Sequence, residues 1–360
     1  MALHRVKLPK SGLVMLRVVV LIKRLLEALS SPTLNAATVN TSWVQTVWPQ
    51  MDGEWVQKFC LGGQEARIQS IAQASPAARL ELCAEFCRQN RVEKMIAGGG
   101  DFKDLSDIPG IDAQLAGIVK EFFKKCYKLL SHDTRRGWKG YEFNGGRSVT
   151  NRTYKEDFCN NYPAKVVCPY CDGDIGTPEL DHYLFKSGFP LLALSPWNLV
   201  PVCSSCNNVI TGKGDRPAIT LGPPRTTSTW LHPFFAPATS EVKISLNGSP
   251  QDSIPQLVSP DPDEQERLDN HVDLIQTLAK RWTNKAAAYH DVIVTEVSRK
   301  IRLNPVSTID SIVQERLVDH QESCGKTASS MIHAAVCQAI LDQRPGYIEE
   351  FTDSNAPMLD

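Results

Sequence analysis

CPYCDGDIGTPELDH, residues 168–182, joins a cysteine pair to an Asp-His pair that follows ten residues later. A second cysteine pair begins less than forty residues beyond the first. Two CxxC pairs at this spacing are typical of one tetrahedral zinc site, and four thiolates fill its coordination sphere. We therefore predict a structural zinc ion that activates no water. Its expected ligands are Cys168, Cys171, Cys203 and Cys206.

The composition indicates an ordinary globular protein. The chain has 360 residues, of which 42% are hydrophobic and 22% charged, enough for roughly two or three domains. A formal net charge of −1 excludes a global field that would attract nucleic acid, so a nucleic-acid partner would need a local basic surface. Eleven cysteines, four of them in CxxC pairs, favour metal binding in a reducing compartment. We expect a cytoplasmic protein.

The N-terminal run LVMLRVVVLIKRLLEAL, residues 13–29, has the hydrophobicity of a signal segment but not its pattern. Arg17, Lys23 and Arg24 interrupt it, and no small-residue cleavage site follows. The charges also break it too often for a bilayer span. We expect an amphipathic helix or a buried strand-helix element, and no membrane partner.

Apolar periodicity predicts an α+β fold that is mostly α. The clearest helical signal covers residues 111–130, where apolar residues recur at helical spacing and form one stripe. Between residues 241 and 263 the chain is rich in Pro and Ser, with VKISLNG as a candidate strand and turn. The predicted regions are a mainly helical N-terminal region (1–155), a zinc-containing module (156–240), a linker (241–263) and a helical C-terminal region (264–360).

Residues 134–155 mix basic and aromatic side chains. Arg135, Arg136 and Arg147 lie in this segment, with aromatic residues and glycines between the basic ones, and Glu142 is its one acid. Such a mixture suits a phosphate backbone with stacked bases. A solvated loop with scattered aromatic anchors is the other interpretation. The three arginines are candidate nucleic-acid contacts.

The insert between the two cysteine pairs contains residues that a plain zinc scaffold does not need. Asp181 and His182 come first, Asn198 follows, and Asn207 comes directly after the last cysteine. With CPYC, LDHYLFKS, SPWNLVPVC and CSSCN, the segment 165–240 resembles an HNH endonuclease of the ββα-metal type. The resemblance implies a central ββα module with one structural zinc ion and one catalytic divalent cation.

The resemblance also implies a mechanism for phosphodiester hydrolysis. His182 would be the general base that takes a proton from water. Asp181 and Asn207 would hold Mg²⁺ or Mn²⁺ through oxygen ligands, with Asn208 as the competing choice for the second position. The cation would neutralise charge on the scissile phosphate and the leaving oxygen. Asn198 would orient His182 by hydrogen bonding.

Lys186 and Lys213 are candidates for phosphate contacts, and both are equally well explained as solvated lysines. The family pattern often has proline where this chain has Phe185, and the distance from Asn207 to Lys213 is longer than its usual tight turn. LHPFF, residues 231–235, resembles a segment that closes the nuclease module in some relatives. It places His232 either near the active site or in the core, bonded to a backbone carbonyl.

The same features, followed by RLDNHVDLIQTLAKRW, resemble the nuclease subunits of bacterial anti-phage defence systems, Septu-like or retron-associated. The resemblance implies a DNA substrate, a partner ATPase subunit of the ABC or SMC type, and a homo-oligomer. The chain has no GxxxxGK[ST] loop, so ATP dependence would come from another chain. An RNA substrate is an open alternative.

A non-catalytic, zinc-stabilised module that binds nucleic acid or protein is the alternative from another class. The two functions predict different geometry. In a nuclease, side-chain oxygens of Asp181 and Asn207 converge, and the ring of His182 is close and accessible. In a binding module they diverge or are buried in unrelated hydrogen bonds.

Overall fold

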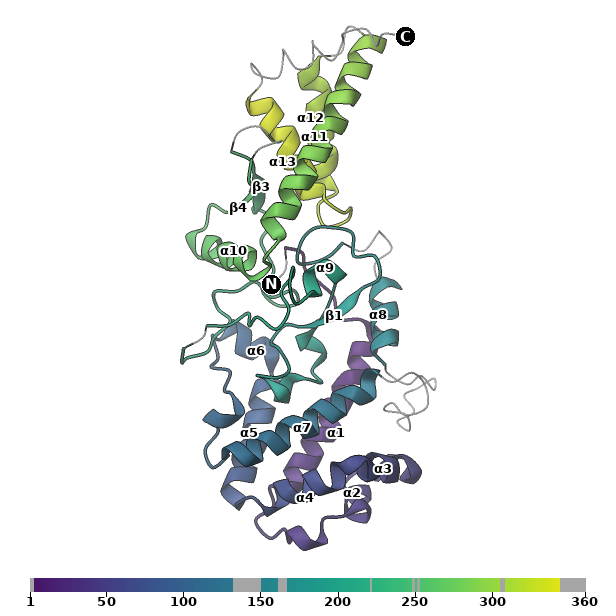
Figure 1. The fold of residues 1–360 in the computed structure, drawn as a ribbon, viewed down its shortest axis with the longest axis vertical. Coiled ribbons are helices and arrows are strands. Elements are labelled where there is room, and N and C mark those ends of the chain that lie inside the picture. The colour runs from purple at the N-terminus through teal and green to yellow at the C-terminus, as the bar shows by residue number, and fades with distance from the viewer. Residues whose placement is uncertain are drawn as a thin grey trace.

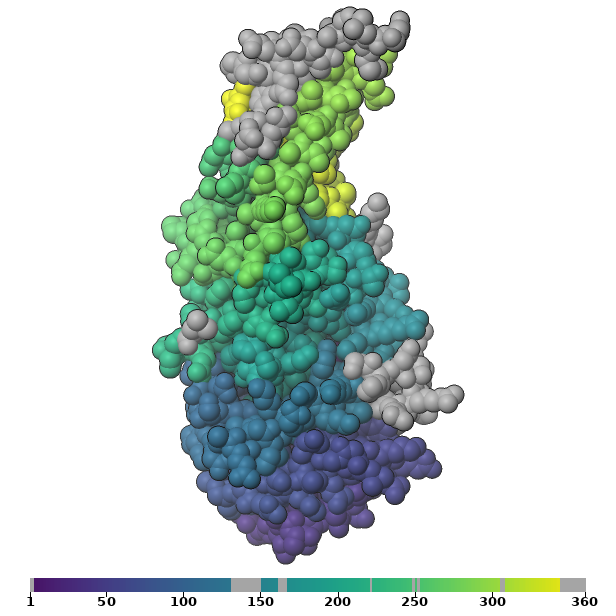
Figure 2. All heavy atoms as spheres, in the orientation of Figure 1, coloured from purple at the N-terminus to yellow at the C-terminus, as the bar shows by residue number. Residues whose placement is uncertain are grey.

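The computed structural model describes residues 3–131, 150–160, 167–220, 222–247, 250, 253–304 and 308–343. The protein is elongated, with N-terminal helices at one end, β1 and α9 in the middle and C-terminal helices at the other end (Figure 1). The space-filling view shows the same order along the long axis (Figure 2). Within these residues, helices dominate and the strands form two small two-stranded sheets, which confirms the predicted α+β, mostly α fold.

The described residues of the N-terminal region are mainly helical, as predicted. Many of its helices begin at a side chain that accepts a hydrogen bond from the first turn, such as Asn40, Asp52 and Ser75. Its helices are α1 (Lys10–Leu29), η1 (Ala36–Thr38), α2 (Thr41–Val47), α3 (Gly53–Phe59), η2 (Cys60–Gln64), α4 (Glu65–Gln73), α5 (Pro76–Gln89), α6 (Val92–Ala97), η3 (Leu105–Asp107), α7 (Ala113–Ser131) and α8 (Asn151–Asn160).

The hydrophobic N-terminal run forms α1, an amphipathic helix. Ile22 and Leu25 are fully buried, while Arg17, Lys23 and Arg24 are exposed on the other side. The charges that argued against a membrane span therefore mark the outer face of the helix. Among the described residues, no helix is long and apolar enough to cross a membrane.

Helix α7 confirms the helix predicted for residues 111–130. Asp112 caps it, accepting a hydrogen bond from the backbone N–H of Leu115 at 2.7 Å. The side chains of Val119, Phe122 and Phe123 on its apolar stripe are fully buried. They join α1, α3, α4 and α5 in one hydrophobic core, which the module enters through Leu191, Leu194 and Leu199.

The module and the C-terminal helices share a second core. It contains all four predicted zinc ligands, Val200 and Val202 of the module, and Trp282 and Val336 of the C-terminal region. The elements around it are β1 (Glu179–His182), η4 (Pro190–Leu192), η5 (Pro196–Asn198), β2 (Leu199–Val202), α9 (Ser204–Asn207), α10 (Pro262–Leu274), α11 (Leu278–Leu303), α12 (Ile309–Glu322) and α13 (Ser330–Asp342).

The predicted linker contains more regular structure than we expected. The strand prediction for VKISLNG is correct, since β3 spans Lys243–Ser245, but β3 pairs with a second strand, β4 (Gln256–Val258). Ile244 and Leu257 lie opposite each other and are buried. Such short strands carry little periodic signal, and packing against α10 and α13 stabilises the hairpin.

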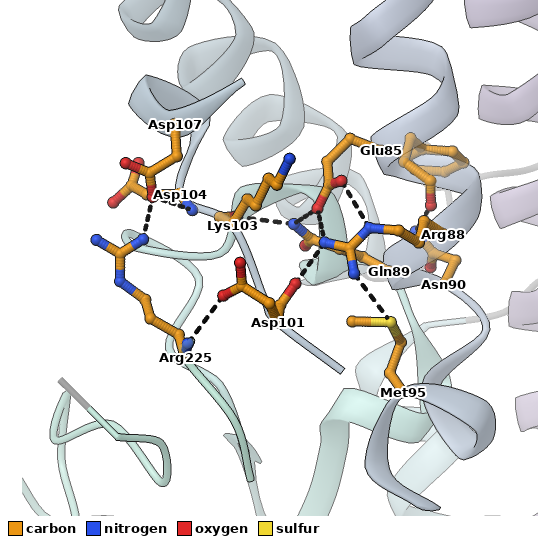
Figure 3. Close-up of polar contacts among 11 residues, drawn as sticks. Glu85, Arg88, Gln89, Asn90, Met95, Asp101, Lys103, Asp104, Asp107 and Arg225 are labelled. Atoms are coloured by element: carbon orange, nitrogen blue, oxygen red, sulfur yellow. Dashed lines mark hydrogen bonds and ion pairs between the residues drawn. The ribbon is translucent and has the colours of Figure 1, made fainter. Parts of the chain in front are cut away.

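A polar network ties the N-terminal region to the module (Figure 3). Arg88 of α5 donates to the carboxylate of Glu85 and to the backbone oxygen of Asp101. Asp101 in turn accepts from the backbone N–H of Arg225 in the module at 2.8 Å. The guanidinium of Arg225 pairs with Asp107. The network therefore fixes a loop of the module against the end of α5.

Candidate metal centre and active site

The four predicted zinc ligands lie together. Their sulfur atoms are all within 4.8 Å of one another, and all four side chains are buried. Backbone turns position them: the N–H of Cys168 donates to the oxygen of Gly173 at 2.8 Å, and the N–H of Cys206 donates to the oxygen of Cys203 at 3.0 Å. Hydrogen bonds from the neighbouring thiols lower the pKa of Cys203, while burial raises the pKa of Cys168. The cluster fits a tetrahedral metal ion such as zinc.

The C-terminal region contributes to this centre in a way that the cysteine spacing did not predict. Arg281 of α11 donates to the sulfur of Cys206 at 3.3 Å. The indole N–H of Trp282 donates to the backbone oxygen of Cys171 at 3.0 Å. Asp172, in the first knuckle, accepts from the backbone N–H of Met331 at the start of α13. These contacts therefore hold the C-terminal helices against the four-cysteine cluster of the module.

The expected ββα order is present around the centre. Strands β1 and β2 pair antiparallel, with Asp181 opposite Val200 and His182 opposite Leu199. The short helix α9 follows β2 directly and ends at Asn207. His182 thus lies at the end of β1, and Asn207 faces the beginning of the same strand, where its amide N–H donates to Glu179 at 2.7 Å.

Asn198 is placed differently from the prediction. Its amide oxygen accepts from the N–H of Leu184 at 2.7 Å, and its amide N–H group donates to the oxygens of Leu184 and Leu192. The ring of His182 instead contacts the backbone oxygen of Ala193, with Nε2 at 3.3 Å. The predicted hydrogen bond from Asn198 to His182 is therefore wrong in this arrangement. Asn198 stabilises the loop that supplies the carbonyl.

Replacing Asn198 with alanine should lower the free energy of unfolding by about 3 kcal/mol, because three buried backbone groups lose their partner. Asn207→Ala is the matched control: Asn207 is only half-buried and bonds one carboxylate, so its effect should stay below about 1 kcal/mol. Urea unfolding followed by circular dichroism measures both. Equal effects of the two substitutions would contradict the assignment of Asn198 as a loop-stabilising residue.

The imidazole of His182 is covered. Its residue is 8% exposed, and the ring of Tyr127 from α7 meets it edge-on with 4.6 Å between ring centroids. Burial, and then the charge of Lys186, lower the pKa of His182 to about 3. Since a carbonyl oxygen only accepts, Nε2 carries the proton in the contact with Ala193. Nδ1 is then the nitrogen with the free lone pair.

Two hydrogen-bond donors occupy the carboxylate oxygens of Asp181. The hydroxyl of Tyr170 donates to one carboxylate oxygen at 2.7 Å, and the ammonium of Lys213 donates to the other at 3.1 Å. Burial raises the pKa of Asp181, and the Lys213 charge and the Tyr170 hydrogen bond oppose that shift. Tyr170 is part of the CPYC knuckle, so the sequence contained this partner although its role was not recognised.

Lys213 is not available to a phosphate. Its side chain is completely buried, and the ammonium also donates to the backbone oxygen of His182 at 2.9 Å. The prediction of a phosphate contact at Lys213 is therefore wrong in this arrangement, because the long turn after Asn207 folds the lysine inward. Lys186 is exposed, with its ammonium 5.0 Å from the centroid of the Tyr127 ring. Its side chain is therefore accessible to a phosphate.

The remaining candidate residues lie in an exposed turn, in the core or outside the described residues. Asn208 accepts from the N–H groups of Ile210 and Thr211 and shapes the exposed turn, so Asn207 is the asparagine that faces β1. His232 is fully buried, packs against the ring of Tyr183 and accepts from the N–H of Phe234, as a core histidine does. Arg135, Arg136 and Arg147 lie outside the described residues.

Comparison with known proteins gives little further identification. No protein-family model matches the chain, and no solved structure matches it. A stretch of 57 residues is 44% identical to Protein ea31 of Escherichia phage lambda. That stretch covers 16% of this chain and 18% of the phage protein. The chain therefore matches less than a fifth of the length of this curated relative.

Proposed function

We propose that the chain is an HNH endonuclease that hydrolyses DNA phosphodiester bonds. The observation that carries the proposal is the position of His182 at the end of β1, in a β-hairpin followed by a short helix and framed by the four cysteines. Its ring contacts the oxygen of Ala193 through Nε2, so Nδ1 would accept a proton from water once the burial that lowers the pKa of His182 is relieved. A base held in one pose is more effective than a mobile one.

The divalent cation of the proposed reaction would be Mg²⁺ or Mn²⁺. Asp181 and Asn207 are its proposed ligands, since carboxylate and amide oxygens suit a hard cation. These residues do not form an open site in the described arrangement, because Tyr170 and Lys213 already occupy both oxygens of Asp181.

A second candidate function is favoured by the same contacts. The carboxylate of Asp181 is buried in hydrogen bonds to Tyr170 and Lys213, and Asn207 contacts Glu179 instead. Separate partners of this kind are what a non-catalytic zinc-stabilised module predicts. Such a module would bind nucleic acid or protein without cleaving it. The role in anti-phage defence, a partner ATPase and a homo-oligomeric state remain predictions.

Cleavage of supercoiled plasmid by zinc-loaded protein tests the proposal. We expect cutting with added Mg²⁺ or Mn²⁺ and none without, and omission of these ions is preferable to EDTA, which would also remove zinc. His182→Asn removes the base, so the rate should fall about 10²–10⁴-fold. His333→Asn is the matched control and should cut normally, because His333 is a half-buried histidine on the distant helix α13.

Two results would count against the nuclease. Equal cutting by wild type and His182→Asn would assign the activity to another group or to a contaminant. Binding of plasmid without cleavage under all metal conditions would favour the non-catalytic module. A parallel assay with a structured RNA distinguishes the two nucleic-acid substrates.

A further inference from the structure

We infer that Tyr127 is a gating residue, which closes the candidate active site by covering the ring of His182. The inference concerns access to His182 and rests on the proposed function only for its effect on cleavage. Tyr127 lies on α7 in the N-terminal helical region, outside the segment 165–240 that carries the HNH resemblance. The N-terminal region therefore controls a site that belongs to the central module.

The first observation is the contact itself. The Tyr127 ring stands edge-on to the His182 ring, with 4.6 Å between centroids and 65° between planes. Only 8% of the surface of His182 is exposed to solvent. A water molecule and a phosphate must both reach the free nitrogen of a general base, and in-line attack requires open space on that side. With the phenol in place, the described arrangement is a closed state.

The second observation is that two other elements hold the phenol in position. Asn151, at the start of α8, donates to the Tyr127 hydroxyl at 3.3 Å. Lys186, in the loop after β1, places its ammonium over the Tyr127 ring at 5.0 Å from the centroid. Cations over aromatic rings are attracted by the ring quadrupole. The cover therefore has one partner on α8 and another in the loop after β1.

The third observation is that the cover can leave without unfolding the N-terminal core. Tyr127 lies in the last turns of α7, which ends at Ser131, and its residue is only half-buried. The side chains of Phe122, Phe123 and Cys126 before it and of Leu130 after it are fully buried and anchor the helix on both sides of Tyr127. A side chain can change its rotamer while the helix backbone stays in place. Rotation of the half-buried Tyr127 side chain would therefore uncover His182 and leave the helix anchored.

Lys186 links opening to the substrate. In the closed state its exposed ammonium is held by the face of the Tyr127 ring, a weaker partner than a phosphate oxygen. A phosphodiester that approaches the hairpin therefore competes with the ring for this cation. Once Lys186 turns to the phosphate, Tyr127 loses one of its two partners. The substrate itself thus favours the open state.

Chemical reactivity of His182 measures access without any assay of catalysis. Diethyl pyrocarbonate acylates accessible neutral imidazoles, and peptide mass spectrometry gives the rate for each histidine. In Tyr127→Ala we expect the rate of His182 acylation to rise about tenfold. This factor corresponds to a change of ~1.4 kcal/mol in the free energy of opening. Tyr127→Phe keeps the ring and its contact with Lys186 but loses the hydrogen bond from Asn151, so its rate should lie between those of wild type and Tyr127→Ala. Tyr289→Ala, which removes an equally large ring from α11, should expose His320 and leave His182 unchanged.

The result separates the gate from the nuclease. Faster acylation together with faster plasmid cleavage by Tyr127→Ala supports both proposals. Faster acylation without cleavage supports the gate and removes the nuclease. Unchanged acylation of His182 in Tyr127→Ala, with circular dichroism of a folded protein, overturns the gate whatever the cleavage assay shows. Tyr127→Leu, which keeps an apolar contact on α7, serves as a second variant if the alanine protein does not fold.

Discussion

Cys206→Ser is expected to release the bound metal and to unfold the centre of the protein. Structural zinc contributes apparent binding free energies of about 10–16 kcal/mol in small metal-dependent domains. A typical domain is stable by only about 5–15 kcal/mol. Loss of the ion would therefore remove a free energy comparable to the whole stability of the domain. Elemental analysis of the purified protein should give one zinc per wild-type chain and a strongly reduced zinc content in the variant.

The unfolding should not stop at the module. The four cysteines belong to the same core as Trp282 and Val336, and Arg281 contacts the sulfur of Cys206 directly. Hydrogen exchange should therefore show loss of protection in β1, β2 and the first turns of α11. The separate core of α1, α4, α5 and α7 should stay protected, because few of its residues come from the module.

Cys324→Ser is the matched control for the loss of a thiol. Cys324 is exposed and lies outside the cluster, so its replacement should leave zinc content and hydrogen exchange unchanged. A Cys206→Ser protein that keeps both its zinc and its protection would show that the four cysteines do not form the metal site. Loss of zinc with full protection would show that the ion is dispensable for the fold.

The features that could be predicted from sequence were the local ones. The spacing of Cys168, Cys171, Cys203 and Cys206 places thiols on two tight turns, and tight turns are fixed by nearby residues. The stripe of α7 and the charges of α1 follow helical periodicity. Each of these signals lies within a segment short enough for the pattern alone to constrain the backbone.

What could not be predicted depends on contacts between distant segments. Arg281 reaches Cys206 from 75 residues away, and Tyr127 reaches His182 from helix α7 of the N-terminal region. No spacing rule connects such pairs. Lys213 shows the same limit at shorter range: polar residues near an active-site motif usually face solvent, and the inward turn of this lysine depends on the buried carboxylate of Asp181.

Lys213→Met is expected to destabilise the protein by about 3–5 kcal/mol. The lysine is completely buried, and its ammonium is the cation that compensates the carboxylate of Asp181. Removing one partner of a buried ion pair leaves an uncompensated charge in a low-dielectric interior, which accounts for a cost of this size. Lys186→Met is the matched control, because Lys186 is exposed, and its effect should be within about 0.5 kcal/mol.

The pair Lys213→Met and Asp181→Asn allows a direct test of the cause. An asparagine at position 181 can still accept from Tyr170, so the double variant has no buried charge and should recover much of the stability lost in Lys213→Met. Urea midpoints of the four proteins give the coupling energy. Independent, additive effects would show that Lys213 and Asp181 do not share a buried contact.

The same variants decide whether Asp181 can hold a divalent cation. In the wild type, Mg²⁺ must compete with a tethered ammonium for the carboxylate, and little stabilisation is expected. In Lys213→Met the carboxylate loses its cation, so Mg²⁺ should raise the urea midpoint, since a ligand that binds only the folded state stabilises it. Adding Asp181→Asn should abolish that rise. A midpoint that Mg²⁺ raises equally in all variants would place the ion elsewhere and remove Asp181 as a ligand.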